Sequence, residues 1–243
     1  MVIDLNCDLG ESFGRYTVGD DVEALRYVTS ANVACGLHAG DPLVMQQTVR
    51  LAAELGVAVG AHPGYPDLQG FGRRVMDLSP AEVEAFVLYQ IGALAGIARA
   101  EGVELAHVKP HGTLYNQAAK DRPTAAAIAR AVRRYGGGLI LVGLAGSMLT
   151  EAGEEAGLRT AGEGFPDRAY QPDGSLRSRK EPGAVLDSLE EICAQAVRLA
   201  QTGRGVETLC IHGDSPHAGA RAAAVRAALE ESGIEVRKLA AGR

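Results

Sequence analysis

The sequence lacks several features that would place it in a familiar class. It has no tryptophan, and its four cysteines are far apart with no CxxC spacing: Cys7, Cys35, Cys193 and Cys210. Such cysteines are typical of buried thiols in a reducing compartment, not of disulfides or a zinc–cysteine site. No run approaches the roughly 18 apolar residues that span a bilayer, and no leader-like segment precedes the first apolar run. We therefore expect a cytoplasmic protein with no membrane partner.

A basic surface is also missing. The chain has 24 Lys and Arg against 30 Asp and Glu, which gives a formal net charge of −6. Because phosphate backbones are bound by clustered Lys and Arg, we expect no nucleic-acid partner. The 243 residues are 47% hydrophobic and 22% charged, a composition and length that suit one large α/β barrel or two small domains.

Three catalytic or nucleotide motifs are absent from the sequence. No GxSxG is present, so a serine nucleophile is not indicated, and Ser12 and Ser215 are better explained by loop and cap roles. No GxGxxG follows the first apolar run, and no GxxxxGK[ST] phosphate loop occurs. Nucleotide chemistry would therefore need another architecture or another chain.

What the chain does have is an alternation of short apolar runs with helical patterns. Strands are predicted at Val2–Cys7, Ala31–Cys35, Val57–Ala61, Leu105–Lys109, Leu139–Val142, Leu158–Ala161, Thr208–Ile211 and Ile234–Leu239. Helix starts are indicated by Asp41-Pro42, by Ser79-Pro80 with Glu82 and by Ser215-Pro216, and helix ends by Gly56, Gly102 and Gly233. This repeat predicts an α/β fold in which residues 1–243 form a single (β/α) barrel of seven or eight parallel strands.

The first indication of a functional site is the stretch Leu105–Asn116, which reads LAHVKPHGTLYN. Its apolar run ends abruptly in Lys109 and His111, and a buried strand ends in titratable groups when that end faces a pocket. A solvated loop is the alternative for this stretch alone.

The same pattern recurs at other strand ends. Polar residues follow these runs at Asn6, Asp8, Glu11, His38, Asp41, His62, His212 and Asp214. Active sites of (β/α) barrels lie at the C-terminal ends of the strands. We therefore expect one cavity to be lined by Asp8, His38, His62, Lys109, His111, His212 and Asp214. His107, inside a strand, and His217, in a helix turn, fall outside the pattern.

Two long loops interrupt the repeat. Gly64–Leu78 contains Arg73 and Arg74, and Gly162–Pro182 contains Arg168, Arg177 and Arg179. Loops of this length at a barrel mouth commonly close over a ligand, and arginine can bind its carboxylate or phosphate in fork geometry. A solvated arginine surface is the alternative for any one of these residues.

Clustered carboxylates and imidazoles serve two main functions in active sites, and the sequence does not decide between them. They hold a divalent metal that activates water, for which Asp8, His38 and His62 are candidate ligands, or they act directly as general base and acid. The three metal candidates come from separate strands and form no compact HxH or HxxxH motif.

Several blocks resemble the LamB/YcsF lactam-utilisation family, which supplies one component of the multi-subunit enzyme 5-oxoprolinase. They are NCDLGESFG (6–14), NVACGLHAGDP (32–42), AHPGYPD (61–67), GFGRR (70–74), HVKPHGTLYN (107–116), DRAYQPDGSLRSR (167–179) and IHGDSPHA (211–218). The resemblance covers nearly the whole chain, with departures at Leu37 and Pro166. It implies a barrel similar to sugar deacetylases, and opening of 5-oxo-L-proline to L-glutamate with ATP hydrolysis, together with partner subunits B and C.

Opening a lactam requires a base, an acid for the leaving nitrogen and stabilisation of the carbonyl oxygen. We assign Asp8 or Asp214 as base, His62, His111 or His212 as acid and Lys109 as the group that stabilises the oxygen. Substrate binding is assigned to Asn6, Glu11, His38, Arg73 and Arg168. A metal-dependent deacetylase or amidohydrolase and a non-catalytic carboxylate-binding subunit remain alternatives, and self-association stays open.

Overall fold

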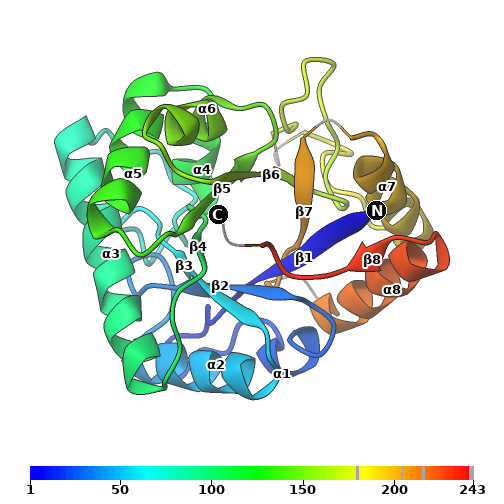
Figure 1. The fold of residues 1–243 in the computed structure, drawn as a ribbon, viewed down its shortest axis with the longest axis horizontal. Helices are drawn as coiled ribbons and strands as arrows, with labels where there is room; N and C mark the ends of the chain where they lie inside the picture. The colour runs from blue at the N-terminus through cyan, green and yellow to red at the C-terminus, as the bar shows by residue number, and fades with distance from the viewer. Residues whose placement is uncertain (179–180, 204, 215–216, 241–243) are drawn as a thin grey trace.

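The computed structural model describes residues 1–178, 181–203, 205–214 and 217–240, and its strands form a closed ring (Figure 1). All strand pairings are parallel, in the order β2-β3-β4-β5-β6-β7-β1-β8, and β1 also pairs with β2. The first seven strands therefore close into a barrel, and β8 pairs with the start of β1. The strands are β1 (Val2–Leu9), β2 (Ser30–Ala34), β3 (Ala58–His62), β4 (His107–Val108), β5 (Ile140–Leu144), β6 (Thr160–Gly164), β7 (Val206–Ile211) and β8 (Glu235–Val236).

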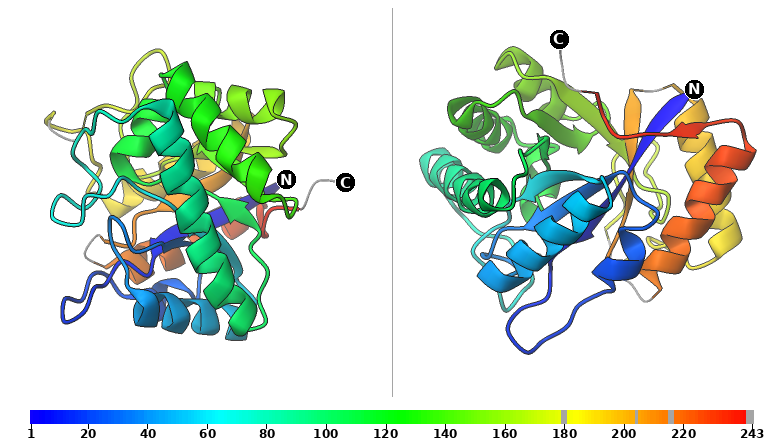
Figure 2. Two further views of the ribbon diagram at one scale, coloured as in Figure 1. Left: turned by 90° about the vertical axis from the view of Figure 1, so that its left-hand side faces the viewer. Right: turned by 60° about the horizontal axis from the view of Figure 1, so that its bottom comes forward.

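Helices surround this ring on its outside (Figures 1 and 2). They are α1 (Asp21–Ala24), α2 (Pro42–Glu54), α3 (Pro80–Ala100), α4 (Gly112–Ala118), α5 (Arg122–Tyr135), α6 (Met148–Glu155), α7 (Leu189–Gln201) and α8 (Ala218–Glu231). The predicted (β/α) barrel is thus confirmed, with each predicted strand within a few residues of an observed one.

Local sequence signals explain where the helices begin and end. The Asp41 side chain accepts from the backbone N–H groups of Leu43 and Val44 at the start of α2, and Ser79 forms a capping box with Glu82 at the start of α3. Gly56, Gly102 and Gly233 follow helix ends with φ between 70° and 74°, as predicted. The predicted start at Ser215-Pro216 and the loop residue Arg179 lie outside the described residues.

Helix α3 is long and apolar enough to cross a membrane by length and composition, with a mean hydropathy of 1.3 over 18 residues. The sequence-based expectation that no such run exists overlooked it. In the structure α3 packs against α5 and α2, and it contributes Val83, Val87 and Ile91 to the core. Helix α3 therefore has the packing of a barrel helix.

Residues of strand β1 alternate between two buried environments, the apolar core between strands and helices and the inside of the barrel. Ile3, Leu5, Cys7 and Leu9 belong to the apolar core shared with the helices. The intervening residues Asp4, Asn6 and Asp8 are also buried, and they hydrogen-bond to side chains of other strands. Because successive side chains of a strand point to opposite faces, the polar set lies inside the barrel. The barrel interior is therefore polar over much of its length.

The segment after β8 crosses one end of the ring (Figure 1). Its Leu239 packs against Ile140, Val142 and Ala161, which lie near the N-terminal ends of β5 and β6. This apolar contact covers the N-terminal end of the barrel. The polar groups expected to do chemistry lie at the other end.

Candidate functional site

Lys109 occupies the barrel interior just beyond β4. Its ammonium nitrogen lies 2.8 Å from Asp8 Oδ1, 2.9 Å from Glu163 Oε1 and 3.1 Å from Asn6 Oδ1, with Cys210 Sγ at 2.9 Å. Burial alone would lower the pKa of Lys109, but Asp8 and the other negative neighbours outweigh it, and the pKa is raised well above its usual value. An ammonium has three hydrogens, so these four neighbours already use its donor capacity.

Asp8 connects this ammonium to the histidines of the site. Its Oδ1 accepts hydrogen bonds from Lys109 and from Asn32 Nδ2 at 2.9 Å, and it lies 3.5 Å from His62 Nε2. Burial raises the pKa of Asp8, but the charges of His62 and Lys109 outweigh burial and hold that pKa well below its ordinary value. Asp8 is therefore an ionised carboxylate at the end of β1.

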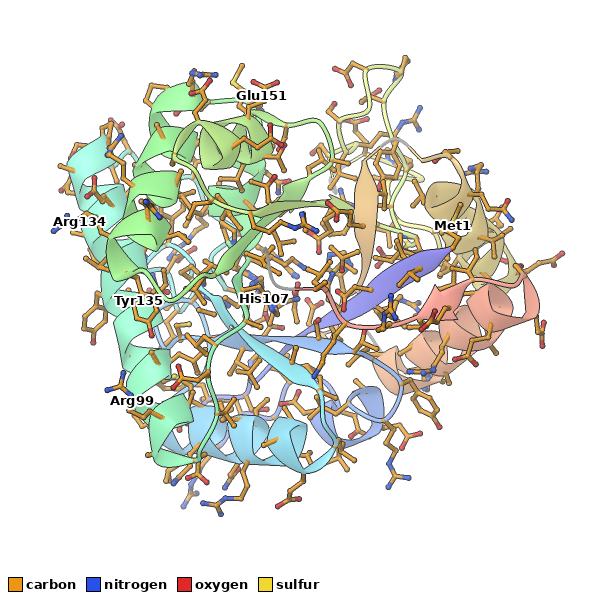
Figure 3. The ribbon with its side chains drawn as sticks, viewed as in Figure 1. Met1, Arg99, His107, Arg134, Tyr135 and Glu151 are labelled. Atoms are coloured by element: carbon orange, nitrogen blue, oxygen red, sulfur yellow. The ribbon has the colours of Figure 1, made fainter. Side chains whose placement is uncertain are left out.

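His107 lies inside the ring of strands (Figure 3). Its Nε2 is 2.7 Å from Asn32 Oδ1, which is an acceptor, so Nε2 carries the hydrogen. Gly60 on the neighbouring strand makes room for the ring, because a Cβ there would lie 2.2 Å from His107 Nε2. Burial, followed by the charge of Lys109, lowers the pKa of His107 to about 3. His107 is a neutral part of the interior network.

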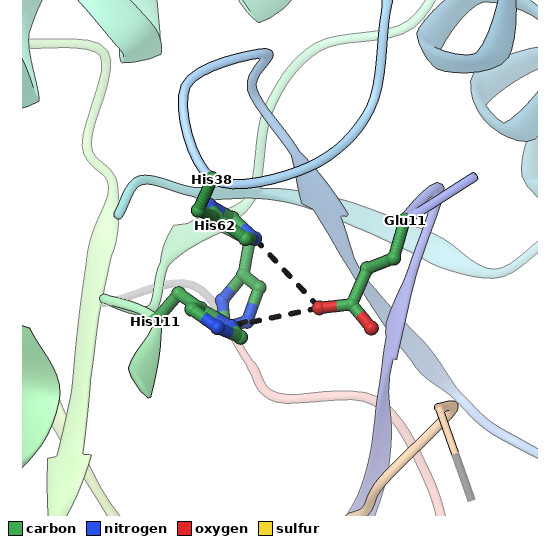
Figure 4. Close-up of side chains that lie close together, drawn as sticks. All are labelled: Glu11, His38, His62 and His111. Atoms are coloured by element: carbon green, nitrogen blue, oxygen red, sulfur yellow. Dashed lines mark hydrogen bonds and ion pairs between the residues drawn. The ribbon is translucent and has the colours of Figure 1, made fainter. Parts of the chain in front are cut away.

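Four buried side chains form a second group beside Asp8 (Figure 4). They are Glu11, His38, His62 and His111, which come from the ends of β1, β2, β3 and β4, and one potential ligand atom of each lies within 4.8 Å of the others. The rings of His38 and His111 are stacked with centroids 3.9 Å apart. We call this group the Glu–His cluster.

His212, just after β7, belongs to a third arrangement. Its Nδ1 lies 2.7 Å from Asp167 Oδ2, and its ring stacks on that of Phe165. Gln195 of α7 donates to the carbonyls of Phe165 and Arg168 and so holds this loop in place. Since a carboxylate on one ring nitrogen fixes the orientation of an imidazole, His212 has the setting of an acid–base group. One potential ligand atom of His212 lies within 4.8 Å of those of Asp8 and Cys210.

Arg73 and Asp214 join two loops at the rim of the site. The guanidinium and carboxylate are 2.5 Å apart, and the side chains are 38% and 18% exposed. Arg73 also lies over the ring of Phe71. Gly72 precedes it with φ of 63°, and a Cβ there would lie 2.8 Å from His111. The loop 64–78 is therefore packed directly against the Glu–His cluster.

Arg168 differs from the other predicted binding residues. It is buried, and its guanidinium donates to the backbone carbonyls of Ala184 and Arg177. These bonds stabilise the segment between β6 and α7, in which Tyr170 also forms an antiparallel bridge with Leu176 and Arg168 one with Val185. Its assigned role in substrate binding stays a prediction, with loop support as the role that its contacts describe.

The structure thus brings most of the predicted strand-end residues into neighbouring groups around Asp8. Asp214 instead pairs with Arg73 at the rim, and Asp41 caps α2. The catalytic roles of these residues stay predictions. Sequence reasoning missed Glu163, Asp167, Cys210 and Asn32, which complete those groups. Glu163 was missed because the sequence placed it in the loop Gly162–Pro182, whereas β6 continues to Gly164 and carries it into the barrel. Asp167 had no sequence signal, since its pairing with His212 spans 45 positions.

The fold is a (β/α) barrel similar to the barrels of deacetylases. The catalytic domain of peptidoglycan N-acetylglucosamine deacetylase from Eubacterium rectale superposes with a TM-score of 0.55 at 11% identity, over 100% of this chain and 90% of that one. At this identity the likeness shows the fold alone. More specifically, the chain belongs to the LamB/YcsF family, whose model matches residues 3–243.

Full-length relatives agree with this assignment. The chain is 58% identical to the 5-oxoprolinase A subunit of Chloroflexus aggregans, over 98% of both chains. It is 54% identical to the 5-oxoprolinase A subunit of Bacillus subtilis, over 96% of this chain and 95% of that one. The crystal structure of a lactam utilization protein from Thermus thermophilus superposes with a TM-score of 0.93 at 50% identity, over 98% of this chain and 100% of that one.

Proposed function

We propose that this chain is the lactam-binding subunit of a 5-oxoprolinase, which opens 5-oxo-L-proline to L-glutamate coupled to hydrolysis of ATP to ADP and phosphate. The observation that carries the proposal is the ionised Asp8 next to His212, which Asp167 orients. The names of relatives that match along nearly the whole chain support the same substrate. Subunits B and C are the proposed partners.

The lactam is an unactivated amide, so its carbonyl carbon resists attack by water. Transfer of the ATP γ-phosphoryl group to the lactam oxygen would make that carbon electrophilic, which is a physical reason for the coupling. The described residues supply groups for the amide, and the sequence contains no phosphate loop. We therefore place nucleotide handling in the complex with the partner subunits.

In this proposal Asp8 takes a proton from the attacking water, and His212 donates one to the ring nitrogen as the C–N bond breaks, which leaves an acyl phosphate. A second water then hydrolyses this acyl phosphate to the carboxylate of glutamate and inorganic phosphate. Lys109 keeps Asp8 ionised through their 2.8 Å contact. The positive charge of Lys109 therefore stabilises the reacting oxygen from behind Asp8, not by direct contact. Arg73 exchanges Asp214 for the carboxylate of the substrate, because a guanidinium binds either carboxylate in the same geometry.

The test is a turnover assay with 5-oxoproline and ATP, using the purified chain alone and mixed with candidate subunits B and C. We expect little turnover alone and ordinary enzymatic rates, about 1–10³ s⁻¹, in the mixture. Asp8→Asn in the mixture should lower turnover at least about 100-fold, the usual contribution of a positioned base.

Other outcomes would contradict the proposal in distinct ways. Lactam opening by the isolated chain without ATP would favour a metal-dependent amidohydrolase, for which the Glu–His cluster supplies suitable groups. Unchanged turnover of the mixture with Asp8→Asn would reduce the chain to a non-catalytic carboxylate-binding subunit.

A further inference from the structure

The hydrogen atoms of two histidines can be placed from their outer contacts. His62 Nδ1 lies 2.7 Å from the backbone carbonyl of Lys109, and His111 Nε2 lies 2.9 Å from that of Phe71. A carbonyl only accepts hydrogen bonds, so each of these nitrogens carries a hydrogen. In neutral rings the other nitrogen of each then presents a lone pair.

Those two lone pairs face each other. His62 Nε2 and His111 Nδ1 are 3.0 Å apart, and two acceptors at hydrogen-bond distance repel unless a positive charge lies between them. Glu11 Oε1 lies 3.5 Å from His111 Nδ1, so a third acceptor faces the same place, and one proton can be shared by only two of these three acceptors. The geometry therefore calls for a different cation.

Three atoms of the other two members have no hydrogen-bond partner among the described residues. They are Glu11 Oε1, His38 Nδ1 and His38 Nε2, and all three are buried. Glu11 Oε1 lies 3.5 Å from His111 Nδ1 and 3.7 Å from His38 Nε2. Buried polar groups are nearly always satisfied. Glu11 Oε1 and His38 Nε2 lie close together without a hydrogen bond, which indicates a missing binding partner between them.

We propose that Glu11, His38, His62 and His111 form a binding site for one divalent transition-metal ion of the Zn²⁺ type. Three imidazole nitrogens and a carboxylate oxygen are suitable Zn²⁺ ligands. Donors about 2.1 Å from a tetrahedral metal lie about 3.4 Å from each other, and the separations of 3.0, 3.5 and 3.7 Å lie on either side of that value.

The residues around the Glu–His cluster hold its side chains in the orientations that metal binding requires. The carbonyls that accept from His62 and His111 fix both tautomers, as outer contacts do around metal-binding histidines. His38 is packed between the ring of His111 and Gly64, where a Cβ would lie only 2.6 Å from His38 Nδ1. The site is thus held in place before any ion binds.

This assignment alters the ligand set expected from the sequence. His38 and His62 remain, while Glu11 and His111 take the place of Asp8, whose Oδ1 is hydrogen-bonded to Lys109 and Asn32. Asp8, Cys210 and His212 form a second group with suitable spacing. The Lys109 ammonium lies within 2.9 Å of both Asp8 and Cys210, and its charge would repel a dication there.

The test is binding of ZnCl₂ to the chelator-treated, full-length chain by calorimetry, together with the visible absorption spectrum after addition of CoCl₂. We expect one equivalent of Zn²⁺ and a Co²⁺ spectrum typical of four-coordinate nitrogen and oxygen ligands. Glu11→Gln and His38→Gln should each weaken binding at least about 100-fold, since even outer contacts of metal ligands contribute 10–100-fold. Melting curves establish that each variant folds, and Zn²⁺ should raise the Tm of the wild type only.

Two matched controls make the outcome decisive. His107→Gln changes a buried histidine outside the cluster, and Cys210→Ser removes the thiol of the second group, so both should bind Zn²⁺ as the wild type does. Binding of less than half an equivalent to the wild type would overturn the proposal. Loss of binding in Cys210→Ser with retention in Glu11→Gln would also overturn it, because the ion would then occupy the other group.

Discussion

Lys109 and Glu163 form an ion pair in the barrel interior, with Nζ 2.9 Å from Oε1 and side chains only 2% and 0% exposed. Lys109 lies just beyond β4 and Glu163 lies on β6, and these two strands are not adjacent in the ring. Taking both charges out of water costs several kcal/mol, which their attraction and the further bonds of Lys109 to Asn6 and Asp8 offset. Removing either residue leaves the other as a buried charge, whose desolvation cost is then no longer offset by the ion pair.

Replacement of the ammonium should therefore destabilise the fold strongly. We expect Lys109→Met to lower the free energy of unfolding by about 3–5 kcal/mol, because Asp8 and Glu163 are left as buried charges without their cation. Urea denaturation measures this change directly.

A double variant separates loss of charge compensation from loss of packing. Lys109→Met with Glu163→Gln removes one of the two stranded carboxylates and should recover part of the lost stability. Lys120→Met, at an exposed position, is the control and should stay within about 0.5 kcal/mol of the wild type. Equal destabilisation of the single and double variants would show that charge is not the cause.

The barrel could be predicted from local patterns because each strand and each helix start carries its own signal. The alternation along β1 and the caps at Asp41 and Ser79 depend on neighbours only a few positions away. Convergence of Asp8, His38 and His62 then followed from the rule that parallel strands end at one edge. These features needed no knowledge of distant contacts.

The pairings inside the site could not be predicted in the same way. Lys109 with Glu163, His212 with Asp167 and Arg73 with Asp214 join positions 45 to 141 residues apart. Which of several equivalent acids meets a given base depends on strand register and loop path, and neither is encoded locally. The tautomers of His62 and His111 likewise depend on carbonyls supplied by other segments.

His107 should make stability depend on pH below neutrality. Its pKa is about 3 in the folded chain and about 6.5 when unfolded, so the unfolded chain binds the extra proton as the pH falls between these values. The contribution of His107 to stability is thus present above pH 6.5 and is lost on acidification, by about 1.4 kcal/mol per pH unit.

The measurement is the free energy of unfolding at several pH values from 6 to 4, for the wild type and for His107→Gln. Glutamine can still donate to Asn32 but does not titrate. We expect the pH slope of the variant to be smaller than that of the wild type by about 1.4 kcal/mol per unit. Parallel curves for the two proteins would mean that His107 is protonated in the folded chain.

Arg73 should act on substrate binding more than on turnover. Replacing it with glutamine removes the charge that we propose binds the lactam carboxylate, and a hydrogen bond to a charged group contributes about 1.5–3 kcal/mol. In the complex with subunits B and C, Arg73→Gln should raise KM for 5-oxoproline about 10–100-fold and change kcat much less. Arg133→Gln, on the exposed side of α5, is the control, and an unaltered KM for Arg73→Gln would remove Arg73 from the binding site.

Gln195 should support the acid–base pair from outside the site. Its side-chain amide is buried and donates to the carbonyls of Phe165, Pro166 and Arg168, on either side of the residue that orients His212. Gln195→Leu should lower the free energy of unfolding by about 1–3 kcal/mol, since these carbonyls lose their donor in a buried setting.

Displacement of that loop should also lower kcat in the complex at least about tenfold, because a shift of even 1 Å in a positioned group costs rate. Gln46→Leu, which removes a glutamine hydrogen-bonded to Glu101 near the surface, controls for loss of an amide elsewhere and should leave kcat unchanged. Asp167→Asn keeps the loop bonds of Gln195 and removes only the carboxylate beside His212, so it should reproduce the loss of kcat with a smaller loss of stability. If Gln195→Leu is destabilised while its kcat stays normal at a temperature where it is folded, the loop supports the fold but does not position His212 for catalysis.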